Sequence, residues 1–418
     1  MQKFYDPQMA PHLNAPTALE PLLPSTPRAD KLLEKAHDLR MEAARLSGAF
    51  PGGVNRELVG LLQSMNAYYS NKIEGEHASP LQIAQALLGR FSQEAETARL
   101  QHLAVAHMQT ERWIQESSLL PADLYAAHTI RSIHSHLFSP WDHEDGGRLP
   151  PGAQVGTNKA TYSPGVLRTC DVVIGRHVAP GWQSLEALLQ QWSKGYGAAR
   201  PGEMQIVAAA AAHHRLLWMH PFVDGNGRVA RLQTLAVMQS LDLAPGLWSP
   251  PRGLARSGGR YYQRLGDADQ LRLDDLDGQG PLSERMLVAW IDFFLDVWLG
   301  EVRFMQRMLN QQEMLGRLSA LLAHEAQVGK RGLRMEALRP LHYLFVTQGS
   351  ITRGDFARMT GLGERTATTL IGKLLGAGLL LSDSPRGAVR FGVPMDALRF
   401  LLPNLWPEAE AAACRSDL

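Results

Sequence analysis

The segment HPFVDGNGRVAR, His220 to Arg231, limits what this chain can fold into more than any other feature. An apolar helical stretch, Glu203 to Met219, runs directly into this segment. Because the residue before a proline is disfavoured in the α region, Pro221 should end that helix. Gly225 and Gly227 then permit a tight turn with positive φ before a new helix begins. The sequence therefore predicts two helices joined by a short glycine-rich turn.

The side chains of the turn indicate phosphate chemistry. A glycine-rich turn that opens a helix gathers unpaired N–H groups around one point, and the helix dipole adds to their attraction for an anion. Arg228 and Arg231 can both lean toward that anion, and two arginines suit a polyphosphate. Asp224 is a hard oxygen ligand suited to Mg²⁺, and Asn226 offers an amide donor to a phosphate oxygen. Histidine has a reference pKa of about 6.5, so His220 suits a general base that deprotonates an attacking hydroxyl.

Length and composition limit the class of protein. The chain has 418 residues, which is too long for one compact core of ordinary size, so two or three domains are expected. Apolar residues make up 45% and charged residues 20%, as in a globular rather than a disordered chain. The net charge of +1 gives no global attraction to nucleic acid or to an anionic membrane, so such binding would need a local patch.

Three features favour a cytoplasmic protein. Cys170 and Cys414 are the two cysteines, lie far apart and form no CxxC pair, which suits a reducing compartment. Met1 to Leu13 contains no apolar core of a secretory signal. The richest apolar stretch, Ile206 to Met219, is interrupted by two histidines and an arginine, which argues against a membrane span.

Helical periodicity covers most of the chain and predicts a mainly α protein. Residues 1–27 look extended, and helices are expected from Ala29, over 55–73, and in segments up to Leu137. Residues 140–180 are rich in Gly and Pro and predict a long loop that ends in a hairpin with a strand at 170–174. A long helix over 283–309, continuing toward Val328, should bury an apolar stripe: Leu287, Ile291, Phe294 and Trp298.

The C-terminal part predicts a different, α+β architecture. Three short helices at 333–349, 353–360 and 364–377 precede two strands within 379–393, which is the outline of a winged helix. Polar groups on the third helix and near the wing could contact DNA: Arg365, Thr366, Thr368, Thr369, Lys373, Arg386 and Arg390. Glu364 and Asp383 dilute this charge, so docking of a protein, or support of a homodimer, is the alternative.

At every specified position, His220 to Arg231 resembles the signature of Fic domains, His-x-Phe-x-Asp/Glu-Gly-Asn-Gly-Arg-x-x-Arg. A chance match at eight fixed positions is expected in far fewer than about one in a million chains of this length. The resemblance implies a mainly helical Fic core with a β-hairpin flap. It also implies AMPylation, in which AMP moves from ATP to a Ser, Thr or Tyr hydroxyl of a protein, the chain itself included, and pyrophosphate leaves.

The resemblance assigns a role to each residue of the segment. His220 would be the general base and Asp224 the ligand of Mg²⁺ or Mn²⁺. The residues that would surround the phosphates of ATP are Gly225, Asn226, Gly227, Arg228 and Arg231. Downstream, Tyr261 and Tyr262 resemble the tyrosine pair near the adenine pocket, although residues 257–259 depart from the commoner Asn-containing pattern.

An upstream stretch is similar to the flap that aligns a target chain by strand addition. It comprises residues 165–168 and 180 and the target-aligning positions Val172, Val173 and Ile174. The preceding residues 149–164 are longer than is usual in the family. Arg168 and Lys159 are equally well interpreted as solvated loop charges.

Ser70-Asn-Lys-Ile-Glu74-Gly75 matches the inhibitory motif of the family, Ser/Thr-x-x-x-Glu-Gly/Asn. It lies at the end of an amphipathic helix before the core, where one inhibited class of the family carries it. Glu74 could pair with Arg231 and so remove the arginine that the γ-phosphate needs. The alternative is that Glu74 is a surface residue at a helix end.

The resemblance suggests a division into five parts. These are a helical regulatory region (1–97), the Fic core (98–299), a connecting helix (300–332), the winged helix (333–400) and a tail (401–418). Two other functions stay open: the reverse reaction or another nucleotidyl or phosphocholine transfer at the same site, and a DNA-binding regulator that senses nucleotides. His213 and His214 suggest a metal cluster only weakly, because no second carboxylate or cysteine completes a tetrahedral set.

Overall fold

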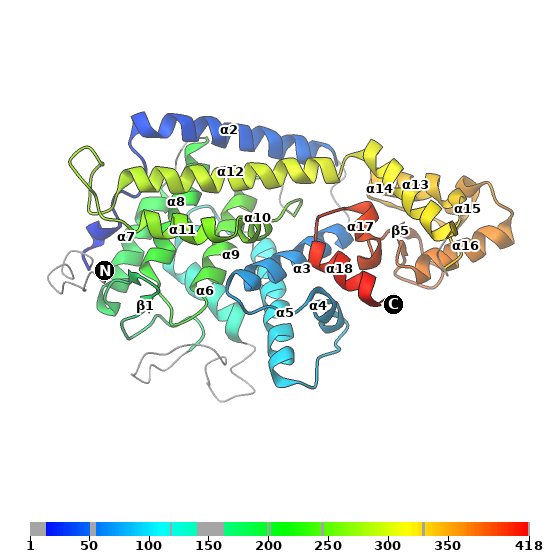
Figure 1. Ribbon diagram of the computed structural model, residues 1–418, viewed down its shortest axis with the longest axis horizontal. Helices are drawn as coiled ribbons and strands as arrows, with labels where there is room; N and C mark the ends of the chain where they lie inside the picture. The colour runs from blue at the N-terminus through cyan, green and yellow to red at the C-terminus, as the bar shows by residue number, and fades with distance from the viewer. Residues whose placement is uncertain are drawn as a thin grey trace.

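The structure is a computed structural model that describes residues 14–50, 56–117, 119–139, 163–198, 200, 202–243, 246–327 and 331–416, the last five by their main chain only. Figure 1 shows an elongated helical body with a smaller module, the C-terminal module (residues 333–400), at one end. The predicted loop residues 140–162, with Lys159, lie outside the described residues, as do residues 1–13. The side chain of Cys414 is also outside the description. The predicted mainly α fold is confirmed.

The helices of the body, in chain order, are α2 (Thr26–Gly48), α3 (Arg56–Ile73), α4 (Pro80–Leu87), α5 (Ala95–Glu116), α6 (Ala127–Phe138), α7 (Leu185–Gly197), α8 (Met204–Met219), α9 (Asn226–Ser240), α10 (Pro250–Arg256), α11 (Gly259–Ala268) and α12 (Glu284–Met308). The next helix, α13 (Gln311–Gln327), lies at the C-terminal module (Figure 1). Short 3-10 turns are η2 (Pro16–Leu19), η3 (Asp123–Tyr125) and η5 (Trp182–Ser184), and a small hairpin consists of β1 (Val173–Ile174) and β2 (His177–Val178). The helix predicted to continue toward Val328 ends at Met308, and α13 follows after a break.

Two long helices form one side of the body. α2 and α12 run side by side along its length (Figure 1). The predicted apolar stripe of α12 is confirmed, because Leu287, Ile291, Phe294 and Trp298 are all buried. Within the supposedly extended N-terminal stretch, Leu19 is also buried, so residues before α2 contribute to the core.

The alanine-rich helix α8 lies at the centre of the body. Its residues 208–212 are all alanine and all buried, and small side chains let neighbouring helices approach closely on every side. The indole Nε1–H of Trp192 in α7 donates to the carbonyl of Ala212 at 3.1 Å, and that of Trp290 in α12 donates to Ala210 at 2.7 Å. These contacts fix the helix that leads into the glycine-rich turn.

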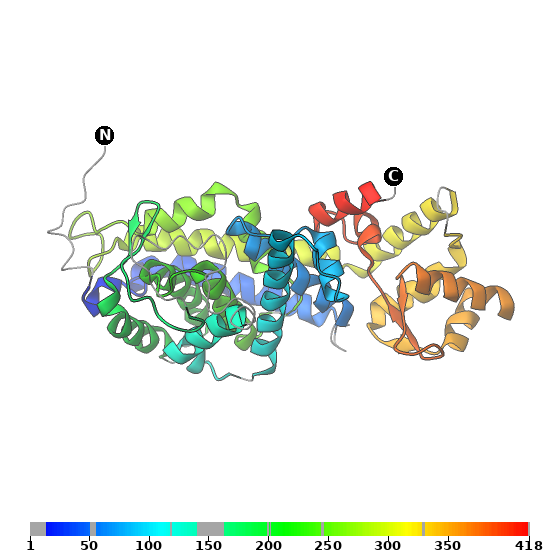
Figure 2. The same cartoon turned by 90° about the horizontal axis from the view of Figure 1, so that it is seen from below.

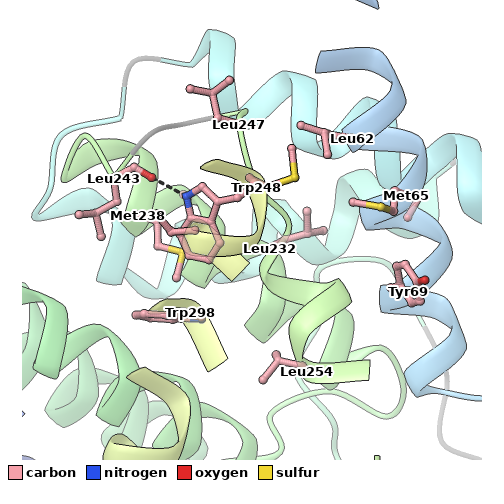
Figure 3. Packing of buried hydrophobic residues seen from close by; sticks show 14 of the residues in the cluster. Leu62, Met65, Tyr69, Leu232, Met238, Leu243, Leu247, Trp248, Leu254 and Trp298 are labelled. Atoms are coloured by element: carbon pink, nitrogen blue, oxygen red, sulfur yellow. Dashed lines mark hydrogen bonds between the residues drawn. The ribbon is translucent and has the colours of Figure 1, made fainter. Parts of the chain in front are cut away.

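Helix α3, which carries the candidate inhibitory residues, packs on the core rather than apart from it. It contacts α5 and α10. Figure 3 shows Leu62, Met65 and Tyr69 of α3 beside buried side chains of α9, α10 and the loop that follows α9. In that loop, Trp248 is held by a hydrogen bond from its Nε1–H to the carbonyl of Leu243 at 2.6 Å.

The C-terminal module contains the predicted helices and hairpin. Its elements are η6 (Met335–Ala337), α14 (Leu338–Thr347), β3 (Ser350–Ile351), α15 (Arg353–Thr360), α16 (Glu364–Gly376), β4 (Leu380–Leu381), β5 (Val389–Phe391) and η7 (Met395–Ala397). The antiparallel sheet has the order β3-β5-β4, so a short strand that the sequence did not predict joins the hairpin. Its assignment as a winged helix stays a prediction.

The residues after the module fold back toward the body. α17 (Leu398–Leu401) forms at the end of the module, and α18 (Pro407–Ser416) forms where a tail, residues 401–418, was predicted. Figures 1 and 2 place both helices between the body and the C-terminal module, and α18 contacts α4. Among the described residues, no helix has the length and apolar content that a membrane span needs.

Candidate active site

The loop between α8 and α9 has the predicted form. α8 ends at Met219, and His220 takes a left-handed conformation with φ 47° and ψ 61°. Gly225, with φ 78°, precedes the first residue of α9, Asn226. Phe222 is fully buried beneath the loop. The turn therefore presents the start of α9 toward His220, as the sequence indicates.

The side chain of Asn226 braces this loop from inside. Its Oδ1 accepts from the main-chain N–H of Phe222 at 2.9 Å, and its Nδ2 donates to the carbonyl of Phe222 at 2.9 Å. The structure thus gives Asn226 an architectural role that the sequence did not reveal. Its predicted bond to a phosphate stays a prediction.

Two glycines make space at the start of α9. A Cβ on Gly225 would lie 2.4 Å from the ring of Phe138, and the positive φ there also favours glycine. A Cβ on Gly227 would lie 2.0 Å from Oε1 of Glu74. The space beside Gly227 is therefore the space that the Glu74 carboxylate fills.

The predicted pair between Glu74 and Arg231 is present. The Nη2 of Arg231 lies 2.5 Å from Oε1 of Glu74, while its Nε and Nη2 donate to the hydroxyl and the carbonyl of Ser70, each at 2.9 Å. Burial favours a higher pKa for Glu74, but the charges of Arg231 and Arg228 outweigh it and lower the pKa. The carboxylate is therefore ionised at neutral pH, and Arg231 has its donors directed to Ser70 and Glu74.

A second carboxylate from the same segment contacts the other arginine. Oε2 of Glu76 lies 3.0 Å from Nη1 of Arg228, and its Oε1 lies 3.1 Å from Nη1 of Arg99 on α5. Arg228 also lies 3.3 Å from Asp224. Sequence reasoning missed Glu76, although its position two residues after Glu74 was a usable signal. Both arginines predicted to hold phosphates are thus paired with carboxylates that follow α3.

Arg168 is buried, so the interpretation of it as a solvated loop charge is wrong. Its guanidinium donates to four main-chain carbonyls: those of His220 at 2.8 Å, Cys170 at 2.8 Å, Pro180 at 2.5 Å and Met219 at 3.3 Å. The main-chain N–H of Arg168 donates to the carbonyl of Pro221 at 2.9 Å. Arg168 therefore joins both ends of the flap segment to the His220 loop.

The flap hairpin is tied to the end of α8 by a second network. Val173 and Ile174 of β1 are exposed and pair with β2, while Val172 is partly buried. The ring Nε2 of His177 lies 2.7 Å from the carbonyl of Trp218, and its Nδ1 lies 3.3 Å from Asp269. The other oxygen of Asp269 lies 3.2 Å from His214, so the carboxylate joins the hairpin to α8.

His220 is in a setting that keeps its imidazole neutral. Burial is the main cause, and the nearby His177 and Arg168 add to it, so that the pKa of His220 falls to about 3. Glu74 acts in the opposite direction, but more weakly. The unprotonated ring that a general base requires is therefore the dominant form at neutral pH.

The two tyrosines differ in exposure. Tyr261 is buried, and its hydroxyl lies 3.0 Å from His213, whose other ring nitrogen lies 2.8 Å from Thr234. Tyr262 is 56% exposed and its hydroxyl donates to the carbonyl of Ile73 at the end of α3. His213 and His214 thus serve hydrogen-bond networks, and the tyrosines' predicted contact with adenine stays a prediction.

A neutral imidazole at the end of α8 and two arginines in the first turns of α9 are thus joined by the glycine-rich turn. Residues 124–238, which include this site, match the family model described as the Fic/DOC family. The chain therefore contains a Fic domain. A Fic family protein from Desulfovibrio desulfuricans G20 has a similar fold, with a TM-score of 0.50 and 15% identity over 86% of this chain and 96% of that one.

The sequence relatives match a short stretch. The protein adenylyltransferase Fic of Drosophila ananassae is 41% identical over 69 residues, which is 16% of this chain and 14% of the relative. The protein of the same name from Drosophila grimshawi is 39% identical over 69 residues, again 16% and 14%. The match thus spans about one seventh of the length of these curated relatives.

Proposed function

We propose that this protein transfers AMP from ATP to a hydroxyl group of a protein and that Glu74 inhibits the reaction. The observation that carries the proposal is the loop of His220, which joins a neutral imidazole at the end of α8 to the glycine-lined start of α9 with its two arginines. The relatives named protein adenylyltransferase support the same reaction. A Ser, Thr or Tyr side chain of a partner protein, or of the chain itself, would be the acceptor.

The proposed transfer of AMP needs no reactant other than ATP, the acceptor hydroxyl and the residues of the site. The acceptor oxygen attacks the α-phosphorus of ATP and forms a new P–O bond, while the bond from that phosphorus to the oxygen bridging to the β-phosphate breaks. His220 takes the hydroxyl proton, and pyrophosphate leaves with the electron pair. Arg228 and Arg231, once free of Glu76 and Glu74, would stabilise the charge of the leaving phosphates.

Asp224 is the residue that would hold a magnesium or manganese ion. In the part of the chain that the structure describes, no group of three or more His, Cys, Asp or Glu side chains could bind a metal on its own. Mg²⁺ usually uses one or two carboxylates together with substrate phosphates, so a single carboxylate beside a phosphate cradle fits. When bound, the ion neutralises phosphate charge.

Substitution of the inhibitory glutamate tests the proposal. Glu74→Gly should raise incorporation of label from ATP labelled at the α-phosphate into the purified protein by at least about tenfold, because a charge-assisted contact of about 1.5–3 kcal/mol no longer occupies Arg231. Glu116→Gly, which alters an exposed glutamate at the end of α5, is the matched control and should label as the wild type does. Absence of labelling in Glu74→Gly, or equal labelling after a further His220→Ala change, would rule the function out.

The same assay separates the alternatives. Mass spectrometry of the Glu74→Gly protein after incubation with a panel of nucleotide and phosphocholine donors identifies the group transferred. Loss of label from a pre-labelled protein, dependent on Glu74, would instead support the reverse reaction. Binding of labelled DNA without any transfer would support the DNA-binding regulator.

A further inference from the structure

The last turn of α3 is held from outside the Fic domain. Glu408 of α18 accepts a hydrogen bond from the hydroxyl of Tyr69 at 2.8 Å, and its other oxygen lies 2.5 Å from Nζ of Lys72. Tyr69 directly precedes Ser70, and Lys72 lies two residues before Glu74. Burial favours a higher pKa for Glu408, but hydrogen bonds from Lys72 and Tyr69 outweigh it and lower the pKa, which keeps the carboxylate charged.

The segment that carries Glu408 is docked firmly on the body. Arg252 of α10 donates to the carbonyls of Leu405 at 2.8 Å and Asn404 at 2.6 Å, and its buried guanidinium pairs with Glu301 of α12 at 2.7 Å. The ring of Trp406, just before α18, packs against Tyr68 of α3 with centroids 5.5 Å apart. The C-terminal segment is therefore anchored to α10 and α12 and packs against α3.

The first turn of α3 is tied to the C-terminal module. Nε of Arg390, in β5, lies 2.8 Å from Glu57, and its Nη1 lies 2.9 Å from Asp383 before β5. Glu57 belongs to the first turn of α3. Residues that follow the Fic domain thus contact both ends of the helix that carries the inhibitory motif.

The inner side of α3 is less completely paired. Asn66 of α3 donates to the carboxylate of Glu111 on α5 at 3.0 Å, yet its own Oδ1 has no hydrogen-bond partner within the described chain. The amide of Asn71 on α3 and the ring nitrogens of His107 on α5 are also buried without a partner there. Buried polar atoms of this kind weaken a packed state relative to one in which water reaches them. External contacts are therefore important for holding α3 in place.

We propose that Glu408 is a positioning residue for Glu74, so that the C-terminal segment, residues 398–411, acts as a latch on the inhibited state. The proposal rests on the inhibitory role of Glu74 stated above. With the latch closed, Tyr69 and Lys72 hold the last turn of α3 where Glu74 meets Arg231. A partner that draws α18 away from α3 would release Glu74 and leave Arg231 free for ATP.

Two measurements on the full-length protein test the latch. Glu408→Gln should raise incorporation of label from ATP by about three- to tenfold, because it removes the charge opposite Lys72 and weakens the bond from Tyr69. In the Glu74→Gly background the same change should add nothing, since the residue that the latch positions is gone. Amide hydrogen exchange, which needs no activity, should become faster over residues 69–76 in Glu408→Gln.

Matched variants separate this role from a general loss of stability. Glu364→Gln makes the same charge change at an exposed position in the first turn of α16, outside the latch, and should label and exchange as the wild type does. Tyr69→Phe removes only the hydroxyl and should reproduce part of the gain, which keeps the test available if Glu408→Gln is unstable. Unchanged exchange at residues 69–76 in both variants overturns the latch, and so does an equal gain with and without Glu74. A Glu74→Gly protein that transfers nothing overturns the proposed function instead.

Discussion

Two buried arginines of the candidate site, Arg231 and Arg168, have different partners. Arg231 directs its guanidinium to the hydroxyl and carbonyl of Ser70, on α3, and to the carboxylate of Glu74, directly after α3. Arg168 directs its guanidinium to main-chain carbonyls of the flap segment and of the His220 loop itself. Both residues are buried arginines. The partners of Arg231 belong to α3 and the residue that follows it, whereas the partners of Arg168 belong to the flap segment and the His220 loop.

The difference determines what each contact can do. A carboxylate can be exchanged for a phosphate, because both are anions with oxygen acceptors, so the pair with Glu74 suits a contact that is made and broken. The acceptors of Arg168 are neutral main-chain carbonyls, which a phosphate does not replace in the same way. The contacts of Arg168 therefore suit a brace, a permanent structural contact that holds the His220 loop. Four substitutions or conditions test this contrast, beginning with the largest expected effect.

Loss of the brace should be the most damaging change. Arg168→Met in the Glu74→Gly background should lower labelling by at least about a hundredfold, because a displacement of His220 of about 1 Å has an effect of that size. The free energy of unfolding in denaturant should also fall by about 3 kcal/mol, since several buried carbonyls lose their donor. Arg176→Met, at an exposed arginine of the same hairpin, is the control. Normal labelling by Arg168→Met would remove the contrast.

Loss of the exchangeable arginine should affect ligand binding more than stability. In the Glu74→Gly background, Arg231→Gln should raise the Kd for ATP by about thirtyfold, as expected for loss of a charge-assisted hydrogen bond. Calorimetry measures the Kd, and denaturant unfolding should show a smaller loss than Arg168→Met does. A loss of stability as large as that of Arg168→Met would show that Arg231 is a brace as well.

Substitution of Asp269 should have a moderate effect on transfer. Asp269→Asn weakens the tie from His177 of the flap to His214 of α8, so transfer to protein should fall by about fivefold, the size expected for a partly exposed charged contact. The Kd for ATP should stay within about twofold, because the change is on the flap side. Asp267→Asn, which alters a partly exposed pair with Arg264 on α11, is the control. A large change in the Kd would contradict a role limited to the flap.

A change of pH should have the smallest effect on labelling. The pKa of His220 is lowered to about 3, so its neutral form persists as the pH falls, and the pKa of Glu74 is lowered as well, so its carboxylate also stays charged. Labelling by Glu74→Gly, and its ratio to the wild type, should therefore change by less than about twofold between pH 6 and pH 8. A histidine with a pKa of about 6.5 would lose most of its base form at pH 6. A decline of that size would show that His220 is protonated in the working enzyme.

Local signals were sufficient to predict the loop of His220, whereas the pair of Arg231 with Glu74 was expected from the resemblance to the inhibitory motif of Fic proteins. Pro221 and Gly225 mark helix boundaries through their own backbone preferences, so α8 and α9 end and begin close to where the sequence indicates. Arg168 was not predictable in this way. Its acceptors are carbonyls at residues 170, 180, 219 and 220, and a carbonyl is present at every position of every sequence.

The missed helices have a different explanation. No helix was predicted where α10 lies, yet Pro is favoured in the first turn of a helix, and α10 begins at Pro250 with Ser249 as its N-cap. The C-terminal tail was assigned no structure, although Pro407 and Glu408 form the same kind of start signal for α18. The contact of Glu408 with α3 joins residues more than three hundred positions apart, and no local pattern reports such a pair.

The space beside Gly227, which the Glu74 carboxylate fills, has a consequence for how the proposed enzyme would respond to its substrate. Glu74 is a competitor on a tether, and a tethered group reaches an effective concentration in the millimolar range or above. Changes in ATP supply within that range would shift the balance only modestly. A small change in where α3 is attached alters that effective concentration directly, so the protein would respond to its binding partners more strongly than to the energy charge of its surroundings.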